Sequence, residues 1–243
     1  QFNSFRILNL ILLKQNGKFK IRKLIIAGTG GQCLMFPPDI KNGKLPVILY
    51  NLGGPFINLI FALIFTVLLF IAVSYPLLSA SALICALVGY IFAFLNGIPM
   101  RMGTVDNDGY NAYSLWKNPE AKQAFWLQMK ISEYISKGFR LNQMPDEWFY
   151  MPHEDSLQNN MIAVIGVFYC NRLMDAHKFE EADAAMETLL DCPSAMVALH
   201  RNLMLCDRLY LALIDGNTEI IGALYSTELK RFMKSMHTFP SVI

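Results

Sequence analysis

The sequence predicts a mostly α-helical, membrane-embedded protein with an N-terminal β-hairpin or small sheet, followed by a soluble α-helical domain. The strongest sign is a stretch without Asp, Glu, Lys or Arg that runs from Leu45 to Met100 and consists mainly of Leu, Ile, Phe, Val and Ala. The second sign is uneven charge: residues 1–44 carry eight Lys or Arg and one acid, although the whole chain is only +2. We therefore expect three domains, 1–44, 45–117 and 118–243.

The uncharged stretch is long enough for two membrane crossings, since each needs roughly 20 apolar residues. We expect them at about 56–73 and 77–95, with a turn at 74–76. A pair of buried core helices is the alternative, but soluble cores rarely run so far without a charge, and the central position excludes a signal peptide. Basic residues on both flanks predict a multi-pass protein of the cell membrane with both ends of this segment cytoplasmic.

The sequence pattern of the basic N-terminal region predicts a β-hairpin. Asn16-Gly17 is a dipeptide favoured in two-residue turns, and near-alternation of basic and apolar residues follows it from Lys18 to Leu24. We expect an apolar first arm at 7–13 and a possible third strand at 28–36. Because no aromatic-rich nucleic-acid motif accompanies the charge, we expect a membrane lipid surface and no nucleic acid as its partner.

From Asn118 onward the pattern is that of a soluble helical domain. Pro119 suits the first position of a helix, and further helices are expected near 156–176, 179–190, 195–214 and 218–234. Small residues at 182, 184 and 185 resemble a tetratricopeptide-type unit, and a plain helical hairpin domain is the alternative. Such a domain would bind a protein partner.

Five cysteines without CxxC spacing argue against a disulfide framework and a zinc ribbon, so we expect reduced thiols. The chain opens with Gln1 and ends "TFPSVI", and we expect it to be an internal piece of a longer protein.

Three polar motifs flank the crossings: "NLGGPFIN" before the first, "NGIP" at the end of the second, and "NDG" just beyond. Asparagine at a membrane boundary is costly without partners. The acid in Asp108-Gly109 would either cap a helix or bind a metal through one oxygen. The residues singled out in the first and third motifs are Asn51, Gly54, Pro55, Asn58, Asn107, Asp108 and Gly109.

The order GPxxN, apolar helix, N-x-I-P and DG, over about residues 5–120, resembles the site-2 protease family of intramembrane zinc metalloproteases, in a bacterial variant with a helical cytoplasmic tail. The resemblance implies that Asp108 is a zinc ligand, that Asn58 of the GPxxN segment, with Asn51, Gly54 and Pro55, lines the cleft for a transmembrane protein or peptide substrate, and that Asn107 and Gly109 support the motif. It also implies that two His and a general-base Glu come from an HExxH helix.

HExxH is missing from this sequence. Its four histidines, at 153, 177, 200 and 237, lie in the tail, where we expect surface or capping roles. In the family the HExxH helix precedes the hairpin, so we expect it upstream of Gln1 and expect this chain alone to be inactive. The usual LDG is NDG here, and Asp106 competes with Asp108 as the ligand.

A non-enzymatic membrane-anchored adaptor with a helical docking domain is the main alternative. In it, Asp106 and Asp108 only terminate a helix. A small transporter is disfavoured because no ionisable residue lies within the crossings.

Overall fold

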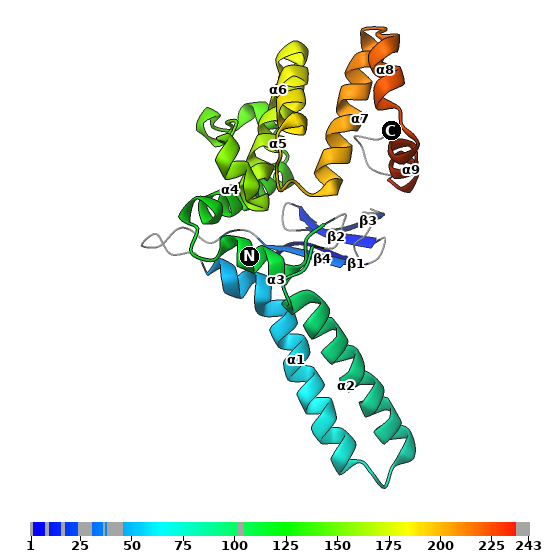
Figure 1. The fold of residues 1–243 in the computed structure, drawn as a ribbon. Coiled ribbons are helices and arrows are strands. Elements are labelled where there is room, and N and C mark those ends of the chain that lie inside the picture. The colour runs from blue at the N-terminus through cyan, green and yellow to red at the C-terminus, as the bar shows by residue number, and fades with distance from the viewer. Residues whose placement is uncertain are drawn as a thin grey trace. The chain divides into compact units, whose positions relative to one another are not determined.

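A computed structural model describes residues 2–7, 10–15, 18–23, 31–35, 37, 46–101 and 105–236. The chain forms two compact units (Figure 1). One comprises Pro46–Met102 and Asp106–Asn118, and the other Gln1–Leu45, Gly103–Val105 and Pro119–Ile243.

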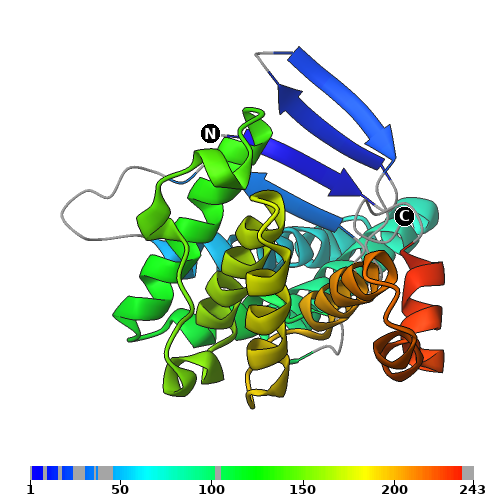
Figure 2. The same cartoon turned by 90° about the horizontal axis from the view of Figure 1, so that it is seen from above.

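The N-terminal strands form a four-stranded antiparallel sheet in the order β3-β2-β1-β4 (Figures 1 and 2). The strands are β1 (Phe2–Ile7), β2 (Leu10–Gln15), β3 (Lys18–Lys23) and β4 (Gly31–Met35). Gln15 pairs with Lys18, as a two-residue turn requires, although Asn16 and Gly17 themselves lie outside the described residues. The expectation of a small sheet is confirmed, but the arm expected at 7–13 is divided between β1 and β2. The third-strand segment pairs as β4 with β1, not with the basic strand.

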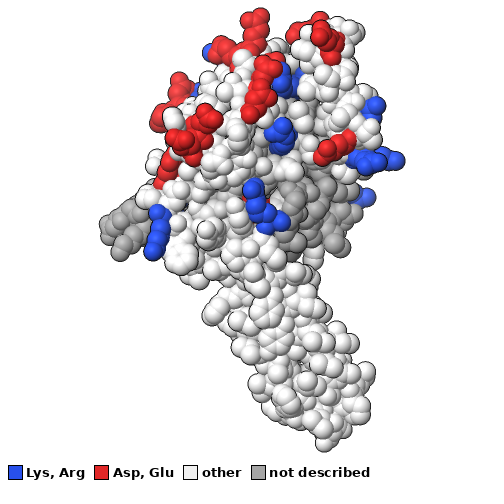
Figure 3. Space-filling model, in the orientation of Figure 1, with Lys and Arg blue, Asp and Glu red and all other residues white. Residues whose placement is uncertain are grey.

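Two long apolar helices, α1 (Val47–Ile71) and α2 (Pro76–Gly97), form an antiparallel pair joined by a short turn. By length and composition both are able to cross a membrane. Their visible surface carries no charged residue (Figure 3). Pro76 begins α2, where its missing N–H costs no hydrogen bond.

The first helix begins nearer the N-terminus than expected. Val47 is its first residue, so the GPxxN motif lies within α1 and does not start it. Pro55 is inside the helix, where it removes one backbone hydrogen bond. The residues before it are apolar apart from Asn51, whose side-chain amide donates to the carbonyl oxygen of Val47 at 2.8 Å. This local bond keeps the Asn51 amide satisfied inside the helix, so the polar motif does not delay the helix start.

Small residues bring α1 and α2 close together. A Cβ placed on Gly89 would lie 3.0 Å from the Cβ of Ala62, and Ala62, Ala82, Ala86 and Ala93 are buried. The large Leu, Ile and Phe side chains point outward instead. This is the arrangement of helices that pack by close backbone approach in lipid.

A short helix, α3 (Asp108–Leu115), completes this unit and buries Ala112 and Leu115. It follows the second apolar helix after a connection whose residues 102–104 lie outside the described part.

The tail is helical, as expected (Figure 2). Its α-helices are α4 (Pro119–Ser136), α5 (Asn160–Asp175), α6 (Phe179–Asp191), α7 (Ala198–Ile214), α8 (Thr218–Leu224) and α9 (Thr227–Ser235), with 3-10 turns η1 (Leu141–Gln143), η2 (Asp146–Trp148) and η3 (Glu154–Gln158). The helix expected at 218–234 is two helices, because the Ser226 hydroxyl accepts from the backbone N–H of Leu229 and starts α9.

Two apolar clusters hold the tail helices. Met186, Leu189 and Cys170 anchor the cluster between α5, α6 and α7. Leu229, Phe232 and Met236 form the other with α7. Helix α7 therefore contributes to both.

Candidate functional site

Three motifs that are separate in the sequence meet at one end of the α1–α2 pair. A Cβ placed on Gly97, in the "NGIP" motif, would lie 3.2 Å from the Cβ of Pro55. A Cβ on Gly109 would lie only 2.3 Å from the carbonyl oxygen of Gly97, and one on Gly54 would lie 4.0 Å from Oδ2 of Asp108. The end of α2 and the start of α3 thus lie against the GPxxN turn of α1.

Asn107 joins α2 to α3. Its side-chain oxygen accepts from the backbone N–H of Tyr110 at 2.9 Å and of Met100 at 3.0 Å, which makes Asn107 the N-cap of α3. Its amide nitrogen donates to the carbonyl oxygens of Leu95 at 2.7 Å and Ile98 at 2.6 Å. The last carbonyls of a helix have no partner within that helix, so this one buried side chain satisfies groups at both helix ends.

Asp108 is the first residue of α3 and is half-buried. Because Asn107 performs the capping, the Asp108 carboxylate is not needed for that role. It makes no side-chain hydrogen bond or ion pair with any residue of the described part of the chain, and its Oδ2 faces Gly54 of α1. Burial raises the pKa of Asp108 above its ordinary value.

Asp106 has a different environment. Nε of Arg101 lies 3.3 Å from its Oδ1, and the two residues also form an isolated backbone bridge. The guanidinium of Arg101 in turn lies over the Tyr110 ring, 5.4 Å from its centre. The Asp106 carboxylate thus already has a cationic partner, Arg101, within the connection between α2 and α3.

The two asparagines of the GPxxN segment differ in their hydrogen bonding. Asn51 is buried and bonds within α1, as described above, whereas Asn58 is half-buried and has no side-chain hydrogen bond within the described residues. Asn51, Pro55 and Asn58 lie on one stripe of the helix because they are four and three residues apart. The backbone oxygen of Asn58 lies 3.2 Å from the Cβ position of Gly89, which places this stripe against α2.

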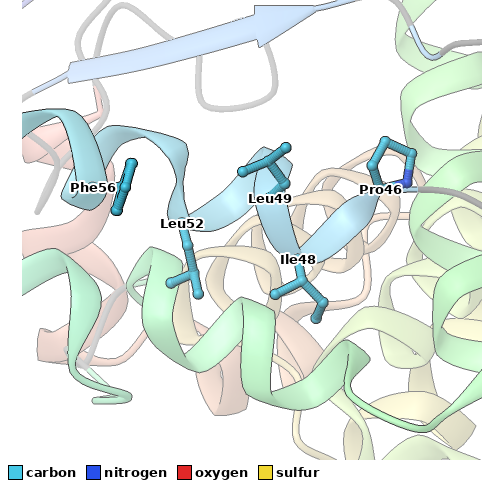
Figure 4. A pocket seen from close by; sticks show the side chains of 5 residues that line it. All are labelled: Pro46, Ile48, Leu49, Leu52 and Phe56. Atoms are coloured by element: carbon cyan, nitrogen blue, oxygen red, sulfur yellow. The ribbon is translucent and has the colours of Figure 1, made fainter.

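A shallow apolar hollow of about 490 Å³ lies along the first turns of α1 (Figure 4). Its lining residues are Pro46, Ile48, Leu49, Leu52 and Phe56, and the last two flank Gly54 and Pro55. Almost all of its surface is hydrocarbon, so it suits an apolar side chain or lipid tail.

No three His, Cys, Asp or Glu side chains lie together as a metal site in the described residues. His153 accepts from the backbone N–H of Asp155 at the start of η3, and His177 occupies a turn with φ of 57°. His200 differs from the expected surface role, because its Nδ1 is enclosed and burial lowers its pKa to about 4. His237 lies outside the described residues.

The structure adds three residues to the site that were not named individually from the sequence, although one of them, Gly97, lies in the NGIP motif. Gly97 and Gly89 provide close backbone approach, and Arg101 pairs with Asp106. A glycine inside a long apolar helix is itself a sign of close packing, so both glycines were recognisable in principle. The Arg101 pairing depends on the fold of the connection and has no sequence signature.

Comparisons with protein-family models, with curated proteins and with solved structures gave no significant match.

Proposed function

We propose that this chain is part of an intramembrane zinc metalloprotease that hydrolyses peptide bonds of membrane-spanning substrates. The observation that carries the proposal is the state of Asp108. It is a half-buried carboxylate without a polar partner in the described residues, at the point where the GPxxN, NGIP and NDG motifs meet.

Asp108 fits one position of a zinc site. Its oxygen atoms are acceptors that no described residue uses, and a three-residue zinc site commonly includes one carboxylate. Asp106 is the weaker candidate because Arg101 holds it. The two remaining ligands, both His, and the general-base Glu would come from an HExxH helix, as in the family that the sequence resembles.

Zinc bound there would polarise the scissile carbonyl and lower the pKa of a bound water. The chain's own residues would hold the substrate. A transmembrane helix hides its backbone carbonyls, so the substrate must unwind locally before cleavage. The unwound segment would extend along the β4 edge of the N-terminal sheet by strand addition, because β4 lacks the basic residues of β3. Asn58 and Gly54 would line the substrate cleft.

The proposal includes the location of the protein. The apolar helices α1 and α2 would cross the cell membrane, with the basic N-terminal region and the tail both in the cytoplasm. The tail would be a tetratricopeptide-like docking domain for a protein partner. Supporting this, Ala182 of α6 is fully buried, and a Cβ on Gly166 of α5 would lie 3.1 Å from Leu189 of α6.

The test is the protein expressed with its complete upstream coding sequence, carrying either Asp108→Asn or Asp106→Asn. Bound zinc is measured by elemental analysis, and proteolysis with a transmembrane reporter. We expect Asp108→Asn to lose zinc and activity and Asp106→Asn to retain both. Full zinc content and activity in Asp108→Asn would refute the proposal, as would an upstream sequence without HExxH.

A membrane-anchored adaptor is the second candidate. One observation favours it: Asn107 and Gly109 both have structural roles, and an acid at the first position of α3 interacts favourably with the helix dipole. In an adaptor, Asp108→Asn would lower stability slightly, by about 0.3–1 kcal/mol, with no change in bound metal.

A further inference from the structure

One face of the N-terminal sheet is apolar. The register pairs Ile21 with Leu12, and Leu12 with Phe5, so these three side chains lie on the same face. Because side chains alternate along a strand, Phe19 joins them from β3, and the pair Leu10 and Ile7 does so from β2 and β1. We name these six residues the apolar sheet face: Phe5, Ile7, Leu10, Leu12, Phe19 and Ile21.

The apolar sheet face is open to its surroundings. Ile21 is 71% exposed, Phe19 62% and Ile7 55%. On the opposite face of the sheet, Arg6 is only 1% exposed. Apolar side chains that adjoin one another in this way are uncommon on a surface that faces only water, and they mark an interaction site.

The charge of the sheet restricts what that site can bind. Its four strands contain no acidic residue. Strand β3 lies at the edge of the sheet and is exposed along its whole length. Its four basic residues, which we name the basic edge, are Lys18, Lys20, Arg22 and Lys23. Because side chains alternate along β3, Lys23, which pairs with Leu10, lies on the apolar sheet face, whereas Lys18, Lys20 and Arg22 lie on the opposite face of the same edge strand. The edge beside the apolar sheet face is therefore cationic on both faces of the sheet.

The covalent chain keeps this sheet near any membrane that α1 enters. About a dozen residues separate Met35, at the end of β4, from Val47, at the start of α1. Fully extended, such a segment spans at most about 40 Å.

We propose that the apolar sheet face lies in the interfacial layer of a membrane rich in anionic lipid, with the basic edge on the lipid phosphates. The apolar residues enter the boundary between headgroups and acyl chains, as the apolar side of an interfacial element does. The long side chains of Lys and Arg on the edge strand can extend around the edge of the sheet, so their charged groups reach the lipid phosphates while the neighbouring apolar residues remain between the headgroups and the acyl chains. The inference is independent of protease activity.

Charge favours lipid over a second copy of this sheet as the occupant of the apolar sheet face. A second copy of this sheet would bring two cationic edges together, and charged residues on an edge strand oppose pairing with another strand. An anionic lipid surface attracts each Lys or Arg near it.

The test is photo-crosslinking of the full chain in vesicles. Phe19→p-benzoylphenylalanine places the probe on the apolar sheet face, and Tyr210→p-benzoylphenylalanine, on the exposed side of α7, is the comparison position. Each protein is reconstituted in phosphatidylcholine alone or mixed with phosphatidylglycerol and irradiated, and adducts are identified by mass spectrometry. We expect lipid adducts at position 19 at roughly ten times the yield at position 210, with phosphatidylglycerol enriched over its share of the mixture.

A charge variant tests the basic edge. Lys18→Gln, Lys20→Gln and Arg22→Gln together should abolish the enrichment of phosphatidylglycerol and leave phosphatidylcholine adducts in place. The same number of changes at exposed tail positions, Lys178→Gln, Lys230→Gln and Arg231→Gln, should leave the enrichment intact. An unchanged circular dichroism spectrum establishes that the variants fold.

Four outcomes would overturn the proposal. A crosslinked dimer through residue 19 would assign the face to a second copy, and an adduct with tail peptides would show that the chain covers it. Equal lipid yields at positions 19 and 210 would show that the apolar sheet face does not contact the membrane. An enrichment of phosphatidylglycerol that survives the loss of the three basic residues would show that the basic edge does not select anionic lipid.

Discussion

The backbone of Gly109 lies against the backbone of Gly97, so closely that a Cβ on Gly109 would stand 2.3 Å from the Gly97 carbonyl oxygen. Real Cβ atoms do not approach an oxygen so closely, and the atom in the way belongs to the main chain of α2, which cannot rotate aside. Gly109→Ala should therefore force α3 away from α2 and cost about 1–3 kcal/mol of unfolding free energy. Thermal unfolding in detergent micelles measures this.

Gly53→Ala is the matched control, since a Cβ there would meet nothing within 4 Å. Alanine in a helix is favoured over glycine by up to about 1 kcal/mol, so this variant should be neutral or slightly stabilised. Equal melting temperatures for the two variants would contradict the close contact at Gly109.

Substitutions of Asn107 can separate the contribution of its side-chain oxygen, which accepts hydrogen bonds, from that of its amide nitrogen, which donates them. Asn107→Ala removes the cap of α3 and the bonds to α2, so it should cost about 2–3 kcal/mol. Asn107→Asp keeps an acceptor for the N–H groups of Tyr110 and Met100 but loses the donations to Leu95 and Ile98. It also puts a negative charge beside two carbonyl oxygens. Asn107→Asp should therefore be no more stable than Asn107→Ala in the same unfolding experiment, whereas a wild-type melting temperature for Asn107→Asp would show that only the cap matters.

The tail should fold without the rest of the chain if α4 is kept. Gln128 of α4 donates to the carbonyl oxygen of Met161 of α5 at 2.6 Å, and Phe125 and Ile131 are buried. A fragment of residues 118–243 should thus be soluble and helical by circular dichroism, and it should melt well above a fragment of residues 150–243. Losing the burial of one Phe or Ile side chain alone costs about 1.5–3 kcal/mol. Equal melting of both fragments would show that α4 contributes nothing to the tail core.

Two half-buried groups on α7, His200 and Asp207, should make the stability of the fragment of residues 118–243 depend on pH in opposite directions. Burial lowers the pKa of His200 to about 4 and raises the pKa of Asp207 to about 7. The unfolded chain binds more protons at His200 below about pH 6.5, so this contribution to stability falls as pH drops from there to 4. The folded chain binds more protons at Asp207 above about pH 4, so that contribution falls as pH rises from 4 to 7.

Single variants should separate the two contributions in urea unfolding between pH 4 and 7. With Asp207→Asn, stability should rise with pH across the lower part of this range, and with His200→Gln it should fall with pH. Each change should be at most about 3–4 kcal/mol. Wild type should vary less than either variant, and parallel profiles for all three proteins would exclude both assignments.

Topology can be tested in cells. If α1 and α2 both cross the membrane, residues before α1 and after α2 lie on the same side. Single cysteines at Lys14 and Lys178, in a background without the native cysteines, should react alike with a membrane-impermeant maleimide and only after lysis. Labelling of one position in intact cells would exclude a paired crossing with cytoplasmic ends.

Composition and periodicity were enough to predict the two long apolar helices, the small sheet and the helical tail, because each has a strong periodic or compositional pattern. The start of α1 was placed wrongly, since Gly54-Pro55 resembles a helix start. The helix instead continues through the motif, with Asn51 satisfied by Val47. Likewise, Thr218 to Lys234 has one continuous helical period, and only the Ser226 cap divides it.

The candidate site was predictable as a set of motifs but not as a contact network. The sequence left Asp106 and Asp108 open as ligands, because both stand beside the same helix end. Their difference arises from a pairing with Arg101 that depends on how the connection folds. In the same way, the sequence identified Asn107 as part of the motif, but its four hydrogen bonds join atoms that only the fold brings together.

The contact between Thr66 and Tyr90 bears on how the proposed membrane helices would enter lipid. The Thr66 hydroxyl donates to the carbonyl oxygen of Ala62 in its own helix at 2.8 Å, and it lies 3.1 Å from the Tyr90 hydroxyl. Helix α1 alone already satisfies the Thr66 donor, whereas the Tyr90 hydroxyl gains this partner only beside α1. If α1 and α2 cross a membrane, as proposed, entry as a paired hairpin would therefore be more favourable than entry one helix at a time.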